Sequence, residues 1–204
     1  RLKAVRGRHI GYLEAHIEQG DTLESGALKI GIVTSIVGIW QYRIVFSGEQ
    51  NHAGTTRMAI RKDAGLALAR FCVAIDETFP GICGPRTVWT AGRIELDPGA
   101  PSIIPGRAEM LLQMRDADTT VIERMEEKLR AMAAEATARG PCGVSVERLR
   151  TGAPAMMDAS FQDAIEAASA ELAGGKSLRM PSGAGHDAQI LATIMPAGML
   201  FVPS

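Results

Sequence analysis

The sequence predicts an α/β protein in which a compact β-α-β-β-α-β module is inserted into a second domain that is present only in part. Strand and helix patterns follow one another in that order between residues 33 and 151. This is the split βαβ arrangement, in which a four-stranded antiparallel sheet carries two helices on one face. The flanking residues 1–32 and 152–204 offer too few elements to bury a parallel sheet on both faces.

The elements of the inserted module are predicted from the periodicity of their apolar residues. Alternation of apolar and polar residues indicates strands, and apolar residues three and four apart indicate helices. A capping box at residues 120–123 is expected to open the second helix, because Thr120 and Glu123 stand at the required spacing. The expected strands lie at 41–47, 86–96, 107–115 and 144–149, and the expected helices at 63–79 and 120–139.

The residue patterns of the flanking segments predict fewer helices and strands. Residues 12–17 alternate, which places Tyr12, Glu14 and His16 on one face of a strand that ends in a polar tip. Polar strand ends are where open α/β sheets bind ligands. An apolar stretch at 30–37, a helix at 160–172, a Gly/Ser-rich connection and a buried strand at 199–202 complete the expected elements.

The composition indicates a soluble globular protein. Among 204 residues, 46% are hydrophobic and 22% are charged, and the net charge is −1. This charge gives no reason to expect binding to nucleic acid or to an anionic membrane. The three cysteines have no paired or metal-finger spacing, and no apolar run is long enough to cross a bilayer. We therefore expect a cytoplasmic protein with reduced thiols.

Three short polar segments carry the candidate chemistry. They are residues 16–20 (His-Ile-Glu-Gln-Gly), 51–56 (Asn-His-Ala-Gly-Thr-Thr) and 182–187 (Ser-Gly-Ala-Gly-His-Asp). Each places a histidine beside small or flexible residues at the end of a predicted element, where rigid scaffolds present reactive side chains. The alternatives are structural. The segment 51–56 can simply form a turn and a helix cap, and Asp187 can either orient His186 or cap the next helix.

Together, in this order, the three segments resemble the peptidase M20 superfamily of dinuclear-metal amidohydrolases. The resemblance is to the branch of N-carbamoyl-L-amino acid hydrolases, β-ureidopropionases and allantoate amidohydrolases, also called the hydantoinase/carbamoylase branch. It implies a zinc-peptidase-like catalytic domain of mixed-sheet type, here residues 1–32 and 152–204. It also implies an inserted ferredoxin-like lid or dimerisation domain, here residues 33–151.

The resemblance also implies roles for individual residues. His16 and His186 match ligands of two divalent metal ions, which are zinc or else manganese or cobalt. His52 matches a lid histidine that polarises the scissile carbonyl group. Gln19 and Arg115 match substrate contacts, with the guanidinium suited to holding a carboxylate bidentately. Ser102 matches a further substrate contact, at a position where the family often has asparagine. Arg57 stands where proline is usual, and Gln113 where aspartate is common.

Several of the family's functional groups have no counterpart in this sequence. The first metal-binding histidine, the bridging aspartate, the metal-binding glutamate and the catalytic glutamate come from a preceding segment in the family. Metals about 3.5–4 Å apart need such a bridge, and a general base must reach the water. We therefore interpret the chain as a fragment of an amidohydrolase, and expect no stable dinuclear site to form in it alone.

For the intact protein, the resemblance implies metal-dependent hydrolysis of a ureido (N-carbamoyl) C–N bond in a small carboxylate substrate. Its partners would be that substrate and a second copy joined through the lid, with no nucleic acid and no membrane. The residues beside His52 and His186 lean slightly toward allantoate rather than an N-carbamoyl-L-amino acid. The alternatives are an M20 aminopeptidase-like hydrolase and, from another class, a catalytically dead dimerisation module.

Overall fold

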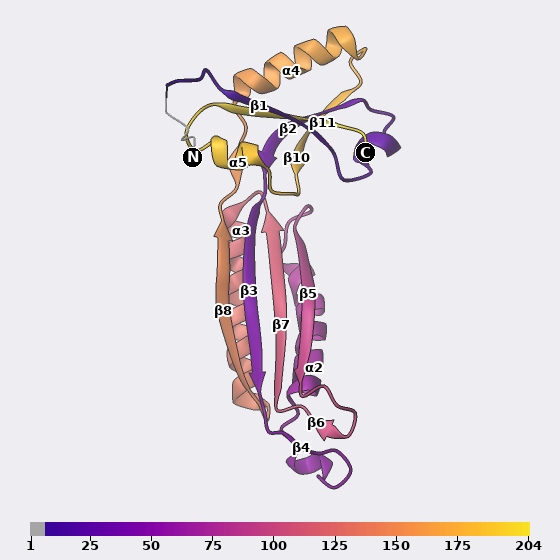
Figure 1. The fold of residues 1–204 in the computed structure, drawn as a ribbon, viewed down its shortest axis with the longest axis vertical. Helices are drawn as coiled ribbons and strands as arrows, with labels where there is room; N and C mark the ends of the chain where they lie inside the picture. Colours follow the sequence, from indigo (N-terminus) through magenta and orange to yellow (C-terminus); the bar gives the residue numbers. More distant parts are fainter. Residues whose placement is uncertain (1–6) are drawn as a thin grey trace. The chain divides into compact units, whose positions relative to one another are not determined.

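The computed structural model describes residues 7–204, which divide into two compact units. The first contains the residues up to Gly38 together with Ala153–Ser204, and the second contains Ile39–Gly152 (Figure 1). A boundary after residue 32 would cut through strand β2 (Ile30–Ile36), which lies in the first unit as a whole.

The first unit is built on a mixed sheet with the strand order β1-β11-β2-β10, and a short strand β9 pairs with β2. β1 runs parallel to β11, and β10 runs parallel to β2, whereas β11 and β2 are antiparallel. The expected strand at 12–17 is confirmed, and β10, which was expected to be a connection, is an additional strand. The remaining bounds are β1 (Tyr12–Ile17), β9 (Ala155–Met156), β10 (Ser177–Ser182), β11 (Ala197–Val202), α1 (Thr22–Ser25), α4 (Ala159–Leu172) and α5 (Asp187–Leu191).

Helix α4 packs on the sheet less completely than its apolar stripe predicts. Ile165 is buried, but Leu172 is 82% exposed. The stripe lines a groove of about 540 Å³ together with Leu13 and Leu200 of the sheet. Leu13 and Ile17, on the apolar face of β1, are about half exposed, so this face of the first unit is only partly covered by the described residues.

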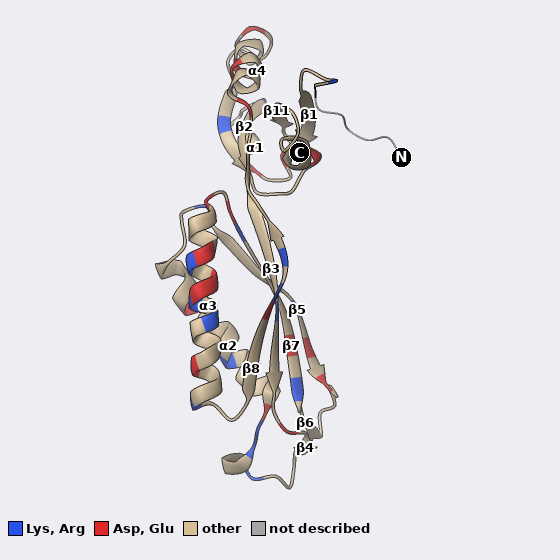
Figure 2. Ribbon diagram, turned by 90° about the vertical axis from the view of Figure 1, so that its left-hand side faces the viewer, with Lys and Arg blue, Asp and Glu red and all other residues tan. Residues whose placement is uncertain are grey.

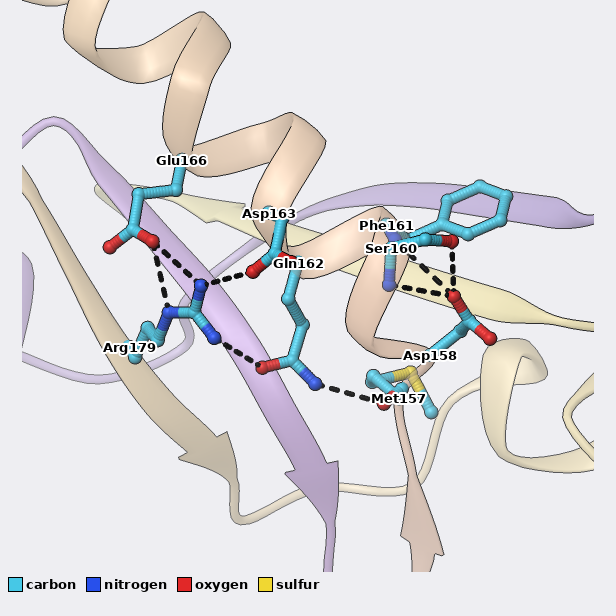
Figure 3. Close-up of polar contacts among 8 residues, drawn as sticks. All are labelled: Met157, Asp158, Ser160, Phe161, Gln162, Asp163, Glu166 and Arg179. Atoms are coloured by element: carbon cyan, nitrogen blue, oxygen red, sulfur yellow. Dashed lines mark hydrogen bonds and ion pairs between the residues drawn. The ribbon is translucent and has the colours of Figure 1, made fainter.

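An ion-pair cluster joins β10 to α4 (Figure 3). The guanidinium of Arg179 donates to Glu166 at 2.6 Å, to Asp163 at 2.7 Å and to the side-chain oxygen of Gln162 at 3.3 Å. Asp158 caps the start of α4 by accepting the Ser160 N–H at 2.9 Å. These bonds fix the helix against the strand that leads into residues 182–187.

The second unit is a four-stranded sheet in the order β5-β7-β3-β8, with α2 and α3 on one face (Figure 2). The pairs β5–β7 and β3–β8 are antiparallel. A two-stranded ribbon of β4 and β6 lies beyond the end of the sheet where β7 begins (Figure 1). The bounds are β3 (Gly38–Ser47), β4 (Asn51–His52), α2 (Ala64–Thr78), β5 (Val88–Asp97), β6 (Ile103–Ile104), β7 (Arg107–Asp116), α3 (Thr119–Arg139) and β8 (Gly143–Gly152), with 3₁₀ turns at Met58–Ile60 and Phe79–Gly81.

The two helices bury their apolar stripes against the inner face of this sheet, as their spacing predicts. Asp63 caps α2 by accepting the Leu66 N–H at 2.9 Å. The capping box expected at 120–123 is wrong. Asp118 is the cap instead, because its carboxylate accepts the Thr120 N–H at 2.8 Å and the helix already begins at Thr119.

Two further observations bear on the chain's setting. Cys72, Cys83 and Cys142 carry free thiols. Among residues 7–204, no helix has both the length and the apolar character that a bilayer span requires.

Candidate functional site

The first unit brings two of the predicted site histidines together. The ring centroids of His16, on β1, and His186, just before α5, lie 4.8 Å apart in an edge-to-face arrangement. His16 Nδ1 lies 2.8 Å from the Ile17 carbonyl oxygen, to which it donates. In the neutral ring this leaves the lone pair on Nε2, as a metal-binding imidazole requires.

His186 is held from two sides in a buried position. Its side chain is only 4% exposed, its Nδ1 lies 3.6 Å from a Glu14 carboxylate oxygen, and its Nε2 lies 2.9 Å from Ser182 Oγ. The other Glu14 oxygen accepts the Ala188 N–H at 2.8 Å. Burial lowers the pKa of His186, which favours the neutral imidazole that can bind a metal.

Gln19 lies directly beyond β1, three residues after His16, in an unusual backbone conformation. Its φ of 57° is in the left-handed region, which is uncommon for residues other than glycine. Its N–H donates to Ser204 Oγ at 3.0 Å, and its side chain is exposed. Residues in such uncommon backbone conformations cluster at functional sites, so the exposed side-chain amide of Gln19 is a candidate for ligand contact.

The second unit presents His52 on a tight loop at the end of β4. Gly54 N–H and Thr55 N–H both donate to His52 Nδ1, at 3.0 and 3.2 Å. Because Nδ1 accepts both bonds, the proton of the neutral ring must be on Nε2. Gly54 allows this close approach, since a Cβ there would lie 3.2 Å from His52 Cε1. The loop thus offers an exposed imidazole N–H as a hydrogen-bond donor.

Ser102 lies beside this histidine. Its carbonyl oxygen accepts the Ala53 N–H at 2.9 Å, and the adjoining Ile103 pairs with His52 in the β4–β6 ribbon. The Ser102 side chain is exposed. The structure therefore places two predicted substrate-contacting residues, His52 and Ser102, at one end of the second unit.

Arg115 lies at the other end of the same unit. It is next to last in β7, whereas the ribbon that carries His52 lies beyond the start of β7 (Figure 1). Arg115 is eight residue steps along the strand from Arg107, a span of about 25 Å. Arg115 Nε donates to Gln113 Oε1 at 2.8 Å, so glutamine at that position orients the guanidinium along the strand. His52 and Arg115 of one chain cannot both contact one small molecule.

Two residues that contact the predicted site were not singled out from the sequence. Glu14, rather than Asp187, is the carboxylate beside His186. The sequence signal that could have identified Glu14 is its position on the same face of β1 as His16. Arg61 bonds to the backbone of the His52 loop, and nothing in the local sequence indicates that contact.

The donors present fit one part of a metal centre. Imidazole rings are suitable ligands for zinc and similar ions, and His16 Nδ1 already has the outer hydrogen bond that orients such a ligand. Within residues 7–204, no three His, Cys, Asp or Glu side chains are grouped so as to hold an ion by themselves. His16 and His186 would therefore hold an ion together with groups other than those described.

This fold is that of a peptidase-like class of proteins. The chain belongs to peptidase family M20/M25/M40, whose model matches residues 2–204. It is 35% identical over 193 residues to an N-carbamoyl-L-amino acid amidohydrolase from Geobacillus stearothermophilus, and 34% identical over 200 residues to an allantoate amidohydrolase from Escherichia coli. Both alignments cover 95% of this chain and 46% of the relative, so the chain spans about half the length of these relatives.

A solved structure is also closely similar. An amidase of the hydantoinase/carbamoylase family from Burkholderia phymatum superimposes with a TM-score of 0.91 at 46% identity. The match covers 98% of this chain and 50% of that protein.

Proposed function

We propose that the protein containing this chain is a metal-dependent amidohydrolase that cleaves a ureido (N-carbamoyl) C–N bond in a small carboxylate substrate. The observation that carries the proposal is the His52 loop, in which two backbone N–H groups occupy Nδ1 and leave Nε2–H as an outward donor. Such a fixed donor is what a developing oxyanion requires. Family membership and the names of the relatives support the same chemistry.

Each residue has a role in the proposed reaction. His16 and His186 are the metal ligands that this chain supplies, and Glu14 orients His186. When bound, two divalent ions (zinc, or manganese or cobalt) would lower the pKa of a water molecule and polarise the ureido group. His52 donates from Nε2 to the oxygen on which negative charge develops. Gln19 and Ser102 contact the substrate, and Arg115 binds its carboxylate with two parallel hydrogen bonds.

We further propose that the second unit is a ferredoxin-like lid through which two copies dimerise. β5 is a ten-residue edge strand, and its apolar residues Val88, Ile94 and Leu96 are about half exposed. An exposed, apolar edge of this length is a natural site for pairing with a second copy. The separation of about 25 Å between the His52 loop and Arg115 supports this proposal, because two copies can supply both groups to one substrate.

The substrate is proposed to be an N-carbamoyl-L-amino acid or allantoate. Both carry a ureido group and a carboxylate, so both match the donors His52 and Arg115. The relatives include enzymes named for each substrate, at nearly equal identity.

The test is hydrolysis of both compounds by the full-length protein. After removal of metal with a chelator, activity should vanish, and it should return on addition of zinc, manganese or cobalt. His52→Ala should abolish turnover in the metal-loaded protein. If neither compound is hydrolysed in the presence of any of the three metals, the proposed reaction is wrong. Turnover by residues 1–204 alone would overturn the interpretation of this chain as an inactive part of the enzyme.

A further inference from the structure

We propose that Arg61 is a positioning residue that holds His52 in its active tautomer and orientation. The inference rests on the proposed role of His52 and adds to it a residue outside the substrate site. Arg61 Nη2 donates to the Ala53 carbonyl oxygen at 2.5 Å, and Arg61 Nε donates to the Thr56 carbonyl oxygen at 3.0 Å. One guanidinium therefore bonds to both ends of the loop segment 53–56.

The first of these bonds acts directly on a donor to the histidine. The Ala53 carbonyl and the Gly54 N–H belong to the same peptide group, which is planar. Fixing the carbonyl oxygen of that group therefore fixes the direction of its N–H, which donates to His52 Nδ1 at 3.0 Å. The second bond holds the far end of the loop, where the Thr56 N–H also donates to the His52 carbonyl oxygen at 3.2 Å.

The orientation of the His52 ring depends on the bonds to its Nδ1. The residue is exposed, so its ring is not held by surrounding core side chains. An exposed imidazole without a fixed partner for Nδ1 can exchange tautomers and rotamers. If the Gly54 and Thr55 N–H groups turn away, Nδ1 can take up the proton, and Nε2 then loses its donor.

Arginine is suited to this contact in a way that lysine is not. The guanidinium is a planar fork whose N–H groups reach two acceptors at once, whereas an ammonium group is a single point on a flexible stem. The 3₁₀ turn at Met58–Ile60 brings the chain back, so that Arg61 approaches the loop it follows. Arg61 is only partly exposed, which protects the two bonds from competing water.

The experiment compares Arg61→Ala and Arg61→Lys with a matched control in the full-length enzyme. Lys62→Ala is the control, because it removes the same charge one residue away and its side chain pairs with the exposed Glu49, at 3.2 Å. ¹⁵N NMR of histidine-labelled protein reports the His52 tautomer independently of activity. Steady-state kinetics with the better ureido substrate report kcat and KM.

We expect the wild type and Lys62→Ala to show His52 as the Nε2–H tautomer. Arg61→Ala should show mixed tautomers and a fall in kcat of about 10–100-fold, since small misplacements of a catalytic group have effects of this size. KM should change much less, because Arg61 does not contact substrate. Arg61→Lys should show the same defects in weaker form. A purely structural residue would change the melting temperature without changing the tautomer.

A pure Nε2–H tautomer and wild-type kcat in a folded Arg61→Ala variant would overturn the inference. If that variant does not fold, Arg61→Lys decides, and wild-type behaviour in both measurements would overturn the inference. Failure of the proposed function is a different result, because the wild type would then hydrolyse neither ureido compound, whereas the His52 tautomer in the Arg61 variants would still decide the role of Arg61.

Discussion

Mixing two inactive variants of the full-length enzyme tests whether His52 of one copy completes the site of another. One variant carries His52→Ala and the other carries His16→Ala, and each should be inactive alone. The length of β7 is the structural reason to expect two chains at each site, because it separates the His52 loop from Arg115 by about 25 Å. A ureido carboxylate is far shorter than that, so one chain cannot supply both groups to one molecule. The mixing experiment tests whether His52 is the group that the second chain supplies.

The expected recovery follows from counting sites in a two-fold dimer. Equal amounts of the two variants, after exchange, give heterodimers as about half of all dimers. In each heterodimer one site has His16 from the first chain and His52 from the second, and is complete. The other site lacks both. About a quarter of all sites should therefore be active, and kcat per chain should approach about one quarter of the wild-type value.

The assay is ureido hydrolysis before and after subunit exchange, and the exchange itself is followed by native mass spectrometry of differently labelled chains. The control is a mixture of His16→Ala with His186→Ala. It should stay inactive, because each site takes both histidines from one chain and every chain in the mixture lacks one of them. If His52 acts on its own chain's site, no heterodimer contains a complete site. An inactive mixture after verified exchange would therefore refute the trans arrangement.

Three further predictions concern the second unit. Arg115→Ala should lower kcat/KM for carboxylate substrates by an amount equivalent to about 2–5 kcal/mol of transition-state stabilisation, and Arg115→Lys should lower it by less. Both variants should lose little kcat/KM with an amide-capped analogue, and equal losses for the two substrate types would mean that Arg115 has a structural role. Gly48→Ala should destabilise the unit by about 1–3 kcal/mol in thermal melts, because its Cβ would lie 2.0 Å from a backbone carbonyl oxygen. Gly92→Ala is the control and should be close to neutral, because its Cβ would have nothing within 4 Å. Equal melting temperatures for the two variants would contradict the prediction. The hydrogen bond from Arg107 lowers the pKa of Glu109 below its usual 4.5, so the ionised Glu109 stabilises the fold above pH 4.5, and this stabilisation is lost as the pH falls through the lowered pKa. The melting temperatures of the wild type and Glu109→Gln should therefore converge in acid. A difference that stays constant with pH would refute this prediction.

The elements predicted from the sequence are those whose pattern is local. The strand Tyr12–Ile17 and the helix Ala64–Thr78 have clear periods of two and of three to four residues, and both form within a residue of the expected bounds. β10 was missed because Pro181 and the polar residues around it resemble a connection. It becomes a strand through parallel pairing with β2, about 147 residues away in the chain at Ser177 and Ile30, and no local pattern encodes that pairing.

The candidate site shows the same limit. The positions of His16, His52 and His186 could be recognised from their motifs, but the groups that orient them could not. Glu14 reaches His186 across the fold, and Arg61 reaches back over the 3₁₀ turn to the carbonyl groups of an earlier loop. Such contacts depend on where the folded chain brings two segments together, which a motif does not describe.

The backbone partners of His16 and His52 set the tautomer of each ring within its own unit. The Ile17 carbonyl sets the tautomer of His16, and the Gly54 and Thr55 N–H groups set that of His52. All of these partners are backbone groups within three residues of the histidine, so the tautomers do not depend on substrate, metal or a second unit. Donors oriented during folding require no reorganisation at the moment of reaction, which is the condition for strong electrostatic stabilisation of a transition state. Changes to these loops should therefore reduce turnover more than they reduce stability.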